Sequence, residues 1–194
     1  IVQAKEQKKR KNLTMVYTYS PQKLLQSFDR LKNKEEELLE RTLDDDLMDR
    51  SEIRNAFVVA ATQISGTALP DSDVSGFCFR AENAIEQAVQ KGANLVLLPE
   101  LWSGPYFCQS QEPDLMMLSG TLESSILIKR MKQLAKLYSV VLPVSFYENK
   151  NNVFYNSVAM IDADGSVLGV YRKSHIPDGP GYQEKFYFTP GDTG

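Results

Sequence analysis

From Phe57 onward, short apolar runs alternate with longer amphipathic segments, and this alternation constrains the fold more than any other feature. Residues 57–61 and 94–98 are apolar runs of the length and composition of buried strands. Between them, residues 77–91 place apolar side chains on one helical face, and Gly92 follows as an expected helix cap. The order strand, helix, strand predicts an α/β protein whose helices cover one face of a sheet.

The rest of the chain continues this pattern. A second amphipathic helix is expected at 124–138, after a loop over 102–120. Strands are expected at 140–147, 154–161 and 167–171, joined by turns at 149–152 and 162–165. Gly194 closes a Pro- and Gly-rich turn that no strand follows. We therefore expect an α/β domain that is incomplete at its C-terminus.

Residues 1–55 differ in character from residues 56–194. They hold nearly half of the charged side chains in under a third of the length. Within them, residues 20–43 read as a helix, with Ser20 as N-cap and Pro21 in the first turn, and Asp44 follows where negative charge is unfavourable. We interpret 1–55 as a charged extension, partly helical or disordered. A docking arm for another subunit is the alternative.

Composition excludes several classes of function. The net charge of −3 gives no electrostatic basis for binding nucleic acid. No apolar stretch is long enough for a membrane helix, and no apolar segment of a secretory signal follows the basic start, so we expect a cytoplasmic protein. His175 is the single histidine, and Cys78 and Cys108 are the two cysteines. We expect two reduced thiols and no metal site.

Charged residues at strand ends are the candidates for chemistry. Glu100 follows the apolar run 95–98, at the end of a strand where α/β sheets place their ligand crevices, and a buried carboxylate there can act as a general base. Lys173 also ends a strand and could stabilise an oxyanion. From spacing alone, a charged residue at the protein surface is the preferred interpretation of either residue. Glu184 lies among aromatic residues at 182–188, which indicates a binding wall or simple loop packing.

Two stretches resemble motifs of the nitrilase superfamily of carbon–nitrogen hydrolases. Residues 96–101 (VLLPEL), with 104–109 (GPYFCQ) after them, resemble the first motif, and residues 171–177 (YRKSHIP) resemble the second. Residues 178–194 are similar to the subfamily that hydrolyses N-carbamoylputrescine. The resemblance covers 57–194 in the family's order and spacing. It implies that 56–194 is the N-terminal part of a carbon–nitrogen hydrolase domain, a nitrilase-type α-β-β-α sandwich.

The resemblance also implies roles for site residues. Glu100 would be the base, Lys173 the oxyanion stabiliser and Glu184 a supporting second glutamate. The family's nucleophilic cysteine lies in a third motif, whose position in the family would come after Gly194. Cys78, placed at a helix start, and Cys108, in the first-motif loop, do not match it. We therefore expect no nucleophile within these residues, and no catalysis by this chain alone.

The activity implied is an amidohydrolase of polyamine biosynthesis. It would convert N-carbamoylputrescine and water to putrescine, carbon dioxide and ammonia, without cofactor or metal. Tyr106, Asp178 or Glu184 could bind the cationic tail of this small-molecule substrate. The intact protein is expected to be a homo-oligomer, and the isolated chain to fold poorly because sheet edges and apolar faces are left exposed.

Two alternatives remain open from the sequence. The first is a related hydrolase of β-ureido acids or ω-amides. An arginine clamp for a substrate carboxylate would favour this alternative. Arg172 is the arginine near the second motif. The second is a truncated, non-catalytic interaction subunit.

Overall fold

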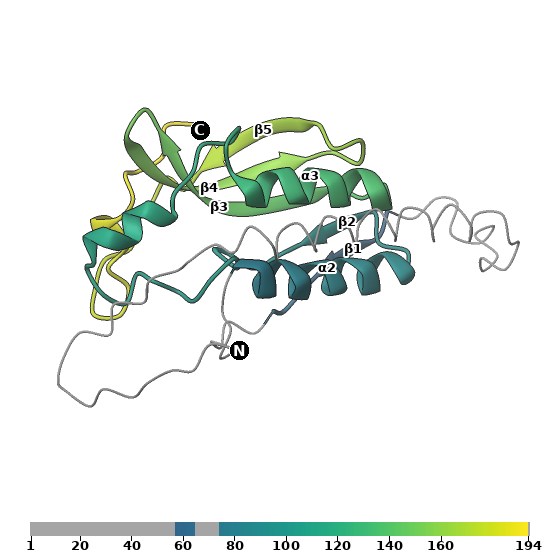
Figure 1. Cartoon of the computed structure of the whole chain (residues 1–194), viewed down its shortest axis with the longest axis horizontal. Helices are drawn as coiled ribbons and strands as arrows, with labels where there is room; N and C mark the ends of the chain where they lie inside the picture. The colour runs from purple at the N-terminus through teal and green to yellow at the C-terminus, as the bar shows by residue number, and fades with distance from the viewer. Residues whose placement is uncertain (1–56, 65–73, 194) are drawn as a thin grey trace, which may run out of the picture.

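The computed structural model describes residues 57–64 and 74–193. The extension 1–55, with its expected helix at 20–43, lies outside these residues. The elements follow the predicted order, with one additional short 3-10 helix in each of the two long loops (Figure 1). In chain order they are β1 (Val59–Ala61), α2 (Val74–Gln90), β2 (Leu95–Leu97), η2 (Pro113–Leu118), α3 (Ile126–Tyr138), β3 (Leu142–Lys150), β4 (Val153–Ile161), β5 (Val167–Arg172) and η3 (Glu184–Phe186).

The strands form a parallel pair and an antiparallel three-stranded sheet. β1 pairs with β2 across the α2 crossover, and β3, β4 and β5 pair as successive hairpins. The two groups meet where Val96 N donates to Val141 O at 3.0 Å and Val141 N donates to Asn94 O at 2.9 Å. β2 therefore ends beside the antiparallel sheet, which brings the residues after it close to β3 and β4.

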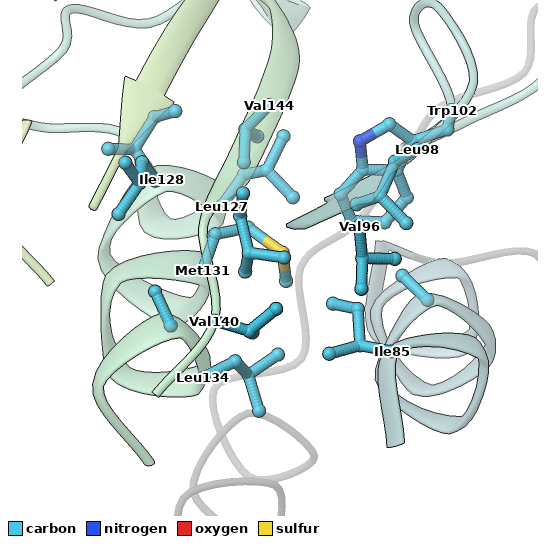
Figure 2. Packing of buried hydrophobic residues seen from close by; sticks show 14 of the residues in the cluster. Ile85, Val96, Leu98, Trp102, Leu127, Ile128, Met131, Leu134, Val140 and Val144 are labelled. Carbon is cyan, nitrogen blue, oxygen red and sulfur yellow. The ribbon is translucent and has the colours of Figure 1, made fainter. Parts of the chain in front are cut away.

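Both helices bury the faces that their periodicity predicts. Ile85 of α2 and Met131 and Leu134 of α3 are fully buried in one cluster with side chains of β2, β3 and β4. Figure 2 shows Ile85 and Val96 facing Met131 and Leu134 across this core. Because one core contains both helices, they cover the same side of the strands, as expected.

Local signals set the helix ends close to the predicted positions. The Ser125 side chain accepts a hydrogen bond from Ile128 N at 3.3 Å, so Ser125 is the N-cap of α3. Gly92 has φ +86 and closes the turn after α2 by donating to Val89 O at 2.8 Å. α2 starts at Val74, earlier than expected, so Cys78 lies inside the helix rather than at its start.

The interpretation of 57–61 and 94–98 as buried strands was wrong for one of their two faces. Ala60 and Val96 pack against the helices, but Val59 is 60% exposed and Leu97 47% exposed. On β5, Val170 packs toward the helices and Tyr171, which points the other way, is 50% exposed. An apolar run indicates a strand covered on both faces, whereas the described residues cover one. The exposed apolar residues on the opposite face match the separate expectation that apolar faces of the isolated chain are left exposed.

A second, aromatic cluster holds the long loops on that opposite face. Phe107 stacks on Tyr147 of β3 at 5.3 Å between ring centroids and meets the edge of Tyr187 at 5.0 Å. The Tyr187 hydroxyl donates to Ser110 O at 2.7 Å and accepts from Glu112 N at 2.8 Å. The loop after β2 and the loop after β5 are thereby fixed against each other.

A buried ion pair joins β3 and β5 on the helix side. Glu148 accepts hydrogen bonds from Arg172 Nε at 2.8 Å and Nη2 at 2.9 Å, and from the Ser157 hydroxyl at 2.7 Å. Burial raises the pKa of Glu148, but the hydrogen bonds and the positive charge of Arg172 outweigh it, and the pKa lies below its ordinary value of 4.5. Glu148 is therefore a carboxylate at neutral pH.

No helix within 57–64 and 74–193 combines the length and apolarity that crossing a bilayer requires.

Two methionines provide a matched test of the core. Met131 is fully buried between the helices, and Met117 is 86% exposed on η2. We expect Met131→Ala to lower the free energy of unfolding by about 2–5 kcal/mol, because it leaves a cavity. Met117→Ala should change it by less than about 0.5 kcal/mol. Urea unfolding monitored by circular dichroism measures both; equal effects would contradict the core described above.

The Glu148–Arg172 pair predicts acid sensitivity. Because the folded-state pKa of Glu148 is depressed, the unfolded state binds more protons as the pH falls below 4.5. The stabilisation is present above that pH and is lost as the pH falls through the folded-state pKa. Glu148→Gln should cost about 3 kcal/mol at pH 7, and the difference from the unmodified protein should shrink on acidification. Denaturation midpoints measured across this range test it; a pH-independent difference would contradict the assignment.

Candidate active site

The structure brings the three charged candidates together, although they come from three separate segments. Lys173 Nζ donates to Glu100 Oε1 at 3.0 Å and to Glu184 Oε2 at 2.8 Å. Glu100 follows β2, Lys173 follows β5 and Glu184 begins η3. A single ammonium group therefore bridges two carboxylates on the side of the sheet away from the helices.

Glu100 lies in the turn after β2. The next residue, Leu101, has φ 47, and its N–H donates to the Ser145 hydroxyl of β3 at 2.9 Å. The expected burial of Glu100 is not observed, since its side chain is 55% exposed. The strand ends at the open side of the sheet, so contacts rather than burial orient the carboxylate. Besides Lys173, Asn156 Nδ2 of β4 donates to Glu100 Oε1 at 2.5 Å.

Lys173 is held by its backbone as well as by its side chain. Lys173 N donates to Asn156 O at 2.9 Å, and Lys173 O accepts from Gly191 N at 2.8 Å. A Cβ at Gly191 would overlap the carbonyl oxygen of Arg172, so this close approach requires glycine. Partial burial lowers the pKa of Lys173, but hydrogen bonds from it to Glu184 and Glu100 and their negative charges raise the pKa above 10.5. Lys173 is therefore an ammonium ion at neutral pH.

Glu184 is the buried member of the group. Its Oε2 accepts from Lys173, and its Oε1 accepts from the Tyr106 hydroxyl at 2.8 Å. Burial and the hydrogen bond to Glu184 raise the pKa of Tyr106, so the phenol stays protonated and remains a donor. Tyr106 is thus part of the site, in contact with a carboxylate of the protein. Its ring lies 6.3 Å from that of Tyr182.

Two other candidates lie apart from this group. Asp178 is exposed in the loop after β5, and within the described residues no hydrogen bond or ion pair joins it to Glu100, Lys173 or Glu184. Arg172 points to the opposite face from Lys173. Its guanidinium binds Glu148, reaches Asp192 Oδ1 at 2.7 Å and lies 4.2 Å from the Tyr155 ring centroid. Arg172 therefore does not form a carboxylate clamp beside Lys173.

The cysteines are both buried, and neither forms a disulfide. Cys108 lies near Tyr106 and Glu184, a proximity that the sequence reasoning did not anticipate. Burial, and then the charge of Glu184, raise the pKa of the Cys108 thiol to about 12. At neutral pH the raised pKa keeps this thiol protonated.

Asn156 is the principal residue that sequence reasoning missed. It lies in the expected strand 154–161, among residues that read as sheet packing. A signal was present, because Asn156 and Ser157 are adjacent polar residues in the middle of an apolar strand, and both are buried. Buried polar side chains require partners, and in this chain the partners are Glu100 and Glu148.

A hollow lies beside the charged group rather than at it. A pocket of about 280 Å³ is bounded by the loop after β2 and the start of α3, with Leu101, Phe107, Ile126 and Tyr147 in its wall. Glu100, Lys173 and Glu184 do not line it.

In the described part of the chain, no group of three or more His, Cys, Asp or Glu side chains is placed to hold a metal ion. What the site offers chemically is a partly exposed carboxylate beside a fixed ammonium group, suited to proton transfer and to stabilising an oxyanion.

Comparison with known proteins identifies the family of the chain. The profile of the carbon–nitrogen hydrolase family matches residues 58–193. An N-carbamoylputrescine amidase from Oryza sativa subsp. japonica is 54% identical over 136 residues, covering 70% of this chain and 44% of the relative. A citrullinase from Francisella tularensis is 53% identical over 115 residues, covering 59% and 40%. The chain thus spans less than half the length of these relatives.

A solved structure shares the fold. The carbon–nitrogen hydrolase from Helicobacter pylori G27 matches with a TM-score of 0.59 and 38% identity, over 71% of this chain and 45% of that one. The expectations of a partial nitrilase-type α/β domain and of membership in a hydrolase family are therefore confirmed. Taken with the match over residues 58–193, they establish that the chain belongs to the carbon–nitrogen hydrolase family of the nitrilase superfamily.

Proposed function

We propose that the whole protein hydrolyses N-carbamoylputrescine to putrescine, carbon dioxide and ammonia. The observation that carries the proposal is the Lys173 ammonium held between Glu100 and Glu184, because it provides a base and an oxyanion stabiliser at one place. The substrate is suggested by the rice relative, which is 54% identical over the matched residues and is named for this compound. On the family resemblance, the same proposal includes a cytoplasmic homo-oligomer.

The proposed reaction needs a cysteine thiol from outside these residues, as the resemblance implies. Glu100 removes the thiol proton, and the thiolate attacks the ureido carbonyl carbon. The C=O electron pair moves to oxygen, and Lys173 stabilises the oxyanion. Ammonia or the amine leaves, carrying the proton that Glu100 took. Water then hydrolyses the carbamoyl thioester and regenerates the thiol; the carbamic acid loses carbon dioxide.

The electrostatics support these roles. Lys173 stays protonated because its pKa is raised, so it can stabilise negative charge without first acquiring a proton. Glu184 is buried and bonded through both oxygens, so it acts in the proposal as the fixed anchor for Lys173. Glu100 is exposed on one side, so its carboxylate can meet a thiol that approaches from elsewhere.

The charges near the site favour a substrate without a carboxylate beside the reacting group. Lys173 is already paired with two carboxylates, and Arg172 is occupied on the other face by Glu148 and Asp192. This weighs against a β-ureido acid held by Arg172. The aromatic faces of Tyr106 and Tyr182 remain candidates for binding an ammonium tail. Asp178 would have to reach the substrate from its exposed loop.

A second candidate substrate is citrulline. The Francisella relative, 53% identical over 115 residues, is named a citrullinase. Citrulline presents the same ureido group, with its charged groups at the far end of an aliphatic chain. The chemistry at Glu100 and Lys173 would be unchanged, so the two substrates differ only in how the tail is bound.

Ammonia release from the protein at its full natural length tests the proposal. We expect turnover of N-carbamoylputrescine, and a loss of at least about 100-fold in kcat for Lys173→Met, because the oxyanion loses its stabilising group. Lys185→Met removes an exposed lysine near the site and serves as the matched control. Turnover of citrulline or N-carbamoyl-β-alanine alone would reject the substrate. Equal activity of the two lysine variants would reject the role of Lys173.

The protonated state of Cys108 gives a second test. In the folded protein at pH 7.5, iodoacetamide should leave Cys108 unmodified, since its thiol is buried and its pKa is raised to about 12. In urea the same residue should react as an ordinary thiol. Mass spectrometry of tryptic peptides measures both. Rapid labelling of folded Cys108, or loss of hydrolysis in Cys108→Ala without loss of stability, would contradict this assignment.

A further inference from the structure

Glu100 is bound through one of its two oxygens. Its Oε1 accepts hydrogen bonds from Asn156 Nδ2 at 2.5 Å and from Lys173 Nζ at 3.0 Å. Among the residues that the structure describes, no hydrogen bond reaches Oε2. An exposed glutamate would ordinarily rotate among several rotamers, so two donors on one oxygen give this side chain a defined orientation.

Asn156 is better suited to impose that orientation than Lys173. It is 3% exposed, in the middle of β4, and opposite Tyr147 of β3 in the sheet. The lysine side chain is long and is shared with Glu184, whereas the amide of Asn156 is carried by a short side chain on a paired strand. Donors on rigid elements position a group more precisely than donors on flexible chains.

Asn156 also binds Lys173, the residue paired with Glu100. Its main-chain oxygen accepts from Lys173 N at 2.9 Å, while its side chain donates to Glu100. Asn156 therefore fixes two groups: the start of the loop that carries Lys173, and the carboxylate of Glu100. The separation between the two groups depends on this residue.

The chemical type of residue 156 fits this task. An amide donates a hydrogen bond at any pH and carries no charge. A carboxylate in its place would repel Glu100, and an apolar side chain of similar shape would leave Oε1 with Lys173 alone. We infer that Asn156 is a positioning residue, which holds Oε1 of Glu100 and leaves Oε2 as the oxygen that accepts the proton. This inference rests on the proposed function of Glu100 as a base.

A matched pair of variants tests the inference in the protein at its full natural length. Asn156→Ala removes the amide that binds Glu100. Asn149→Ala, in the same hairpin, removes an amide that accepts a hydrogen bond from Asn152 N at 3.1 Å, away from the site. We expect Asn156→Ala to lower kcat by about 10- to 100-fold, with KM within about twofold, since misplacing a reacting group costs this much. Asn149→Ala should leave both constants within about twofold.

A double-mutant cycle separates positioning from a general structural effect. If Asn156 acts through Glu100, then Asn156→Ala should cause no further loss of kcat in a Glu100→Gln background. An equal fold-loss in both backgrounds would overturn the inference. So would equal kcat values for Asn156→Ala and Asn149→Ala.

Asn156→Asp adds a readout that a packing role would not change, and it keeps the shape if the alanine variant folds poorly. Its new carboxyl group should repel Glu100 when ionised and donate to it when protonated. Relative to the unmodified protein, its kcat should therefore recover as the pH is lowered. A constant ratio across pH would count against the inference.

If the unmodified protein hydrolyses no carbamoyl compound, the proposed function fails, and the positioning is still tested by structure. Crystal structures of the unmodified protein and of Asn156→Ala would then be compared. Displacement of the Glu100 carboxylate from Lys173 Nζ in the variant supports the positional role. An unchanged carboxylate overturns it.

Discussion

Two adjacent cations at the end of β5 organise the surroundings of the site. Because successive side chains of a strand point to opposite faces, Arg172 and Lys173 lie on different sides of the sheet. A charge that is even partly buried must be paired, and β3 and the loops provide the partners. On the helix side Arg172 binds Glu148 and Asp192, and on the open side Lys173 binds Glu100 and Glu184. Segments that are distant in sequence thereby become fixed to one strand end.

The parts of the fold predicted from sequence are those encoded by local signals. The buried faces of α2 and α3 follow from residue periodicity, and the β3–β4 turn follows from Asn151 and Asn152, which take φ values of 53 and 61. Whether other residues cover the second face of a strand is not encoded in the strand's own sequence. For this reason β1 and β2 were wrongly predicted to be buried on both faces. Successive side chains of a strand alternate between its two faces, so the sequence already indicated that Arg172 could not share a face with Lys173.

The site was predictable for a different reason. Glu100 and Lys173 are separated by 73 residues, and no periodicity indicates that they touch. Motif resemblance identified them, and the geometry accounts for why each motif carries a charged residue just after a strand. Asn156 escaped because the motifs do not include it. Its signal was physical, a polar side chain in an apolar strand, and such a residue needs a partner that the sequence alone does not name.

The candidate site and the uncovered apolar surface share one face. Asn156 and Glu100 lie on the side away from the helices, as do Val59, Leu97 and Tyr171, which are exposed there. Removing water from a site strengthens the interactions between its charges and the reacting atoms. Covering this face would therefore both stabilise the fold, by burying apolar area, and lower the effective dielectric around Glu100 and Lys173. In this domain, stability and electrostatic strength at the site depend on the same surface.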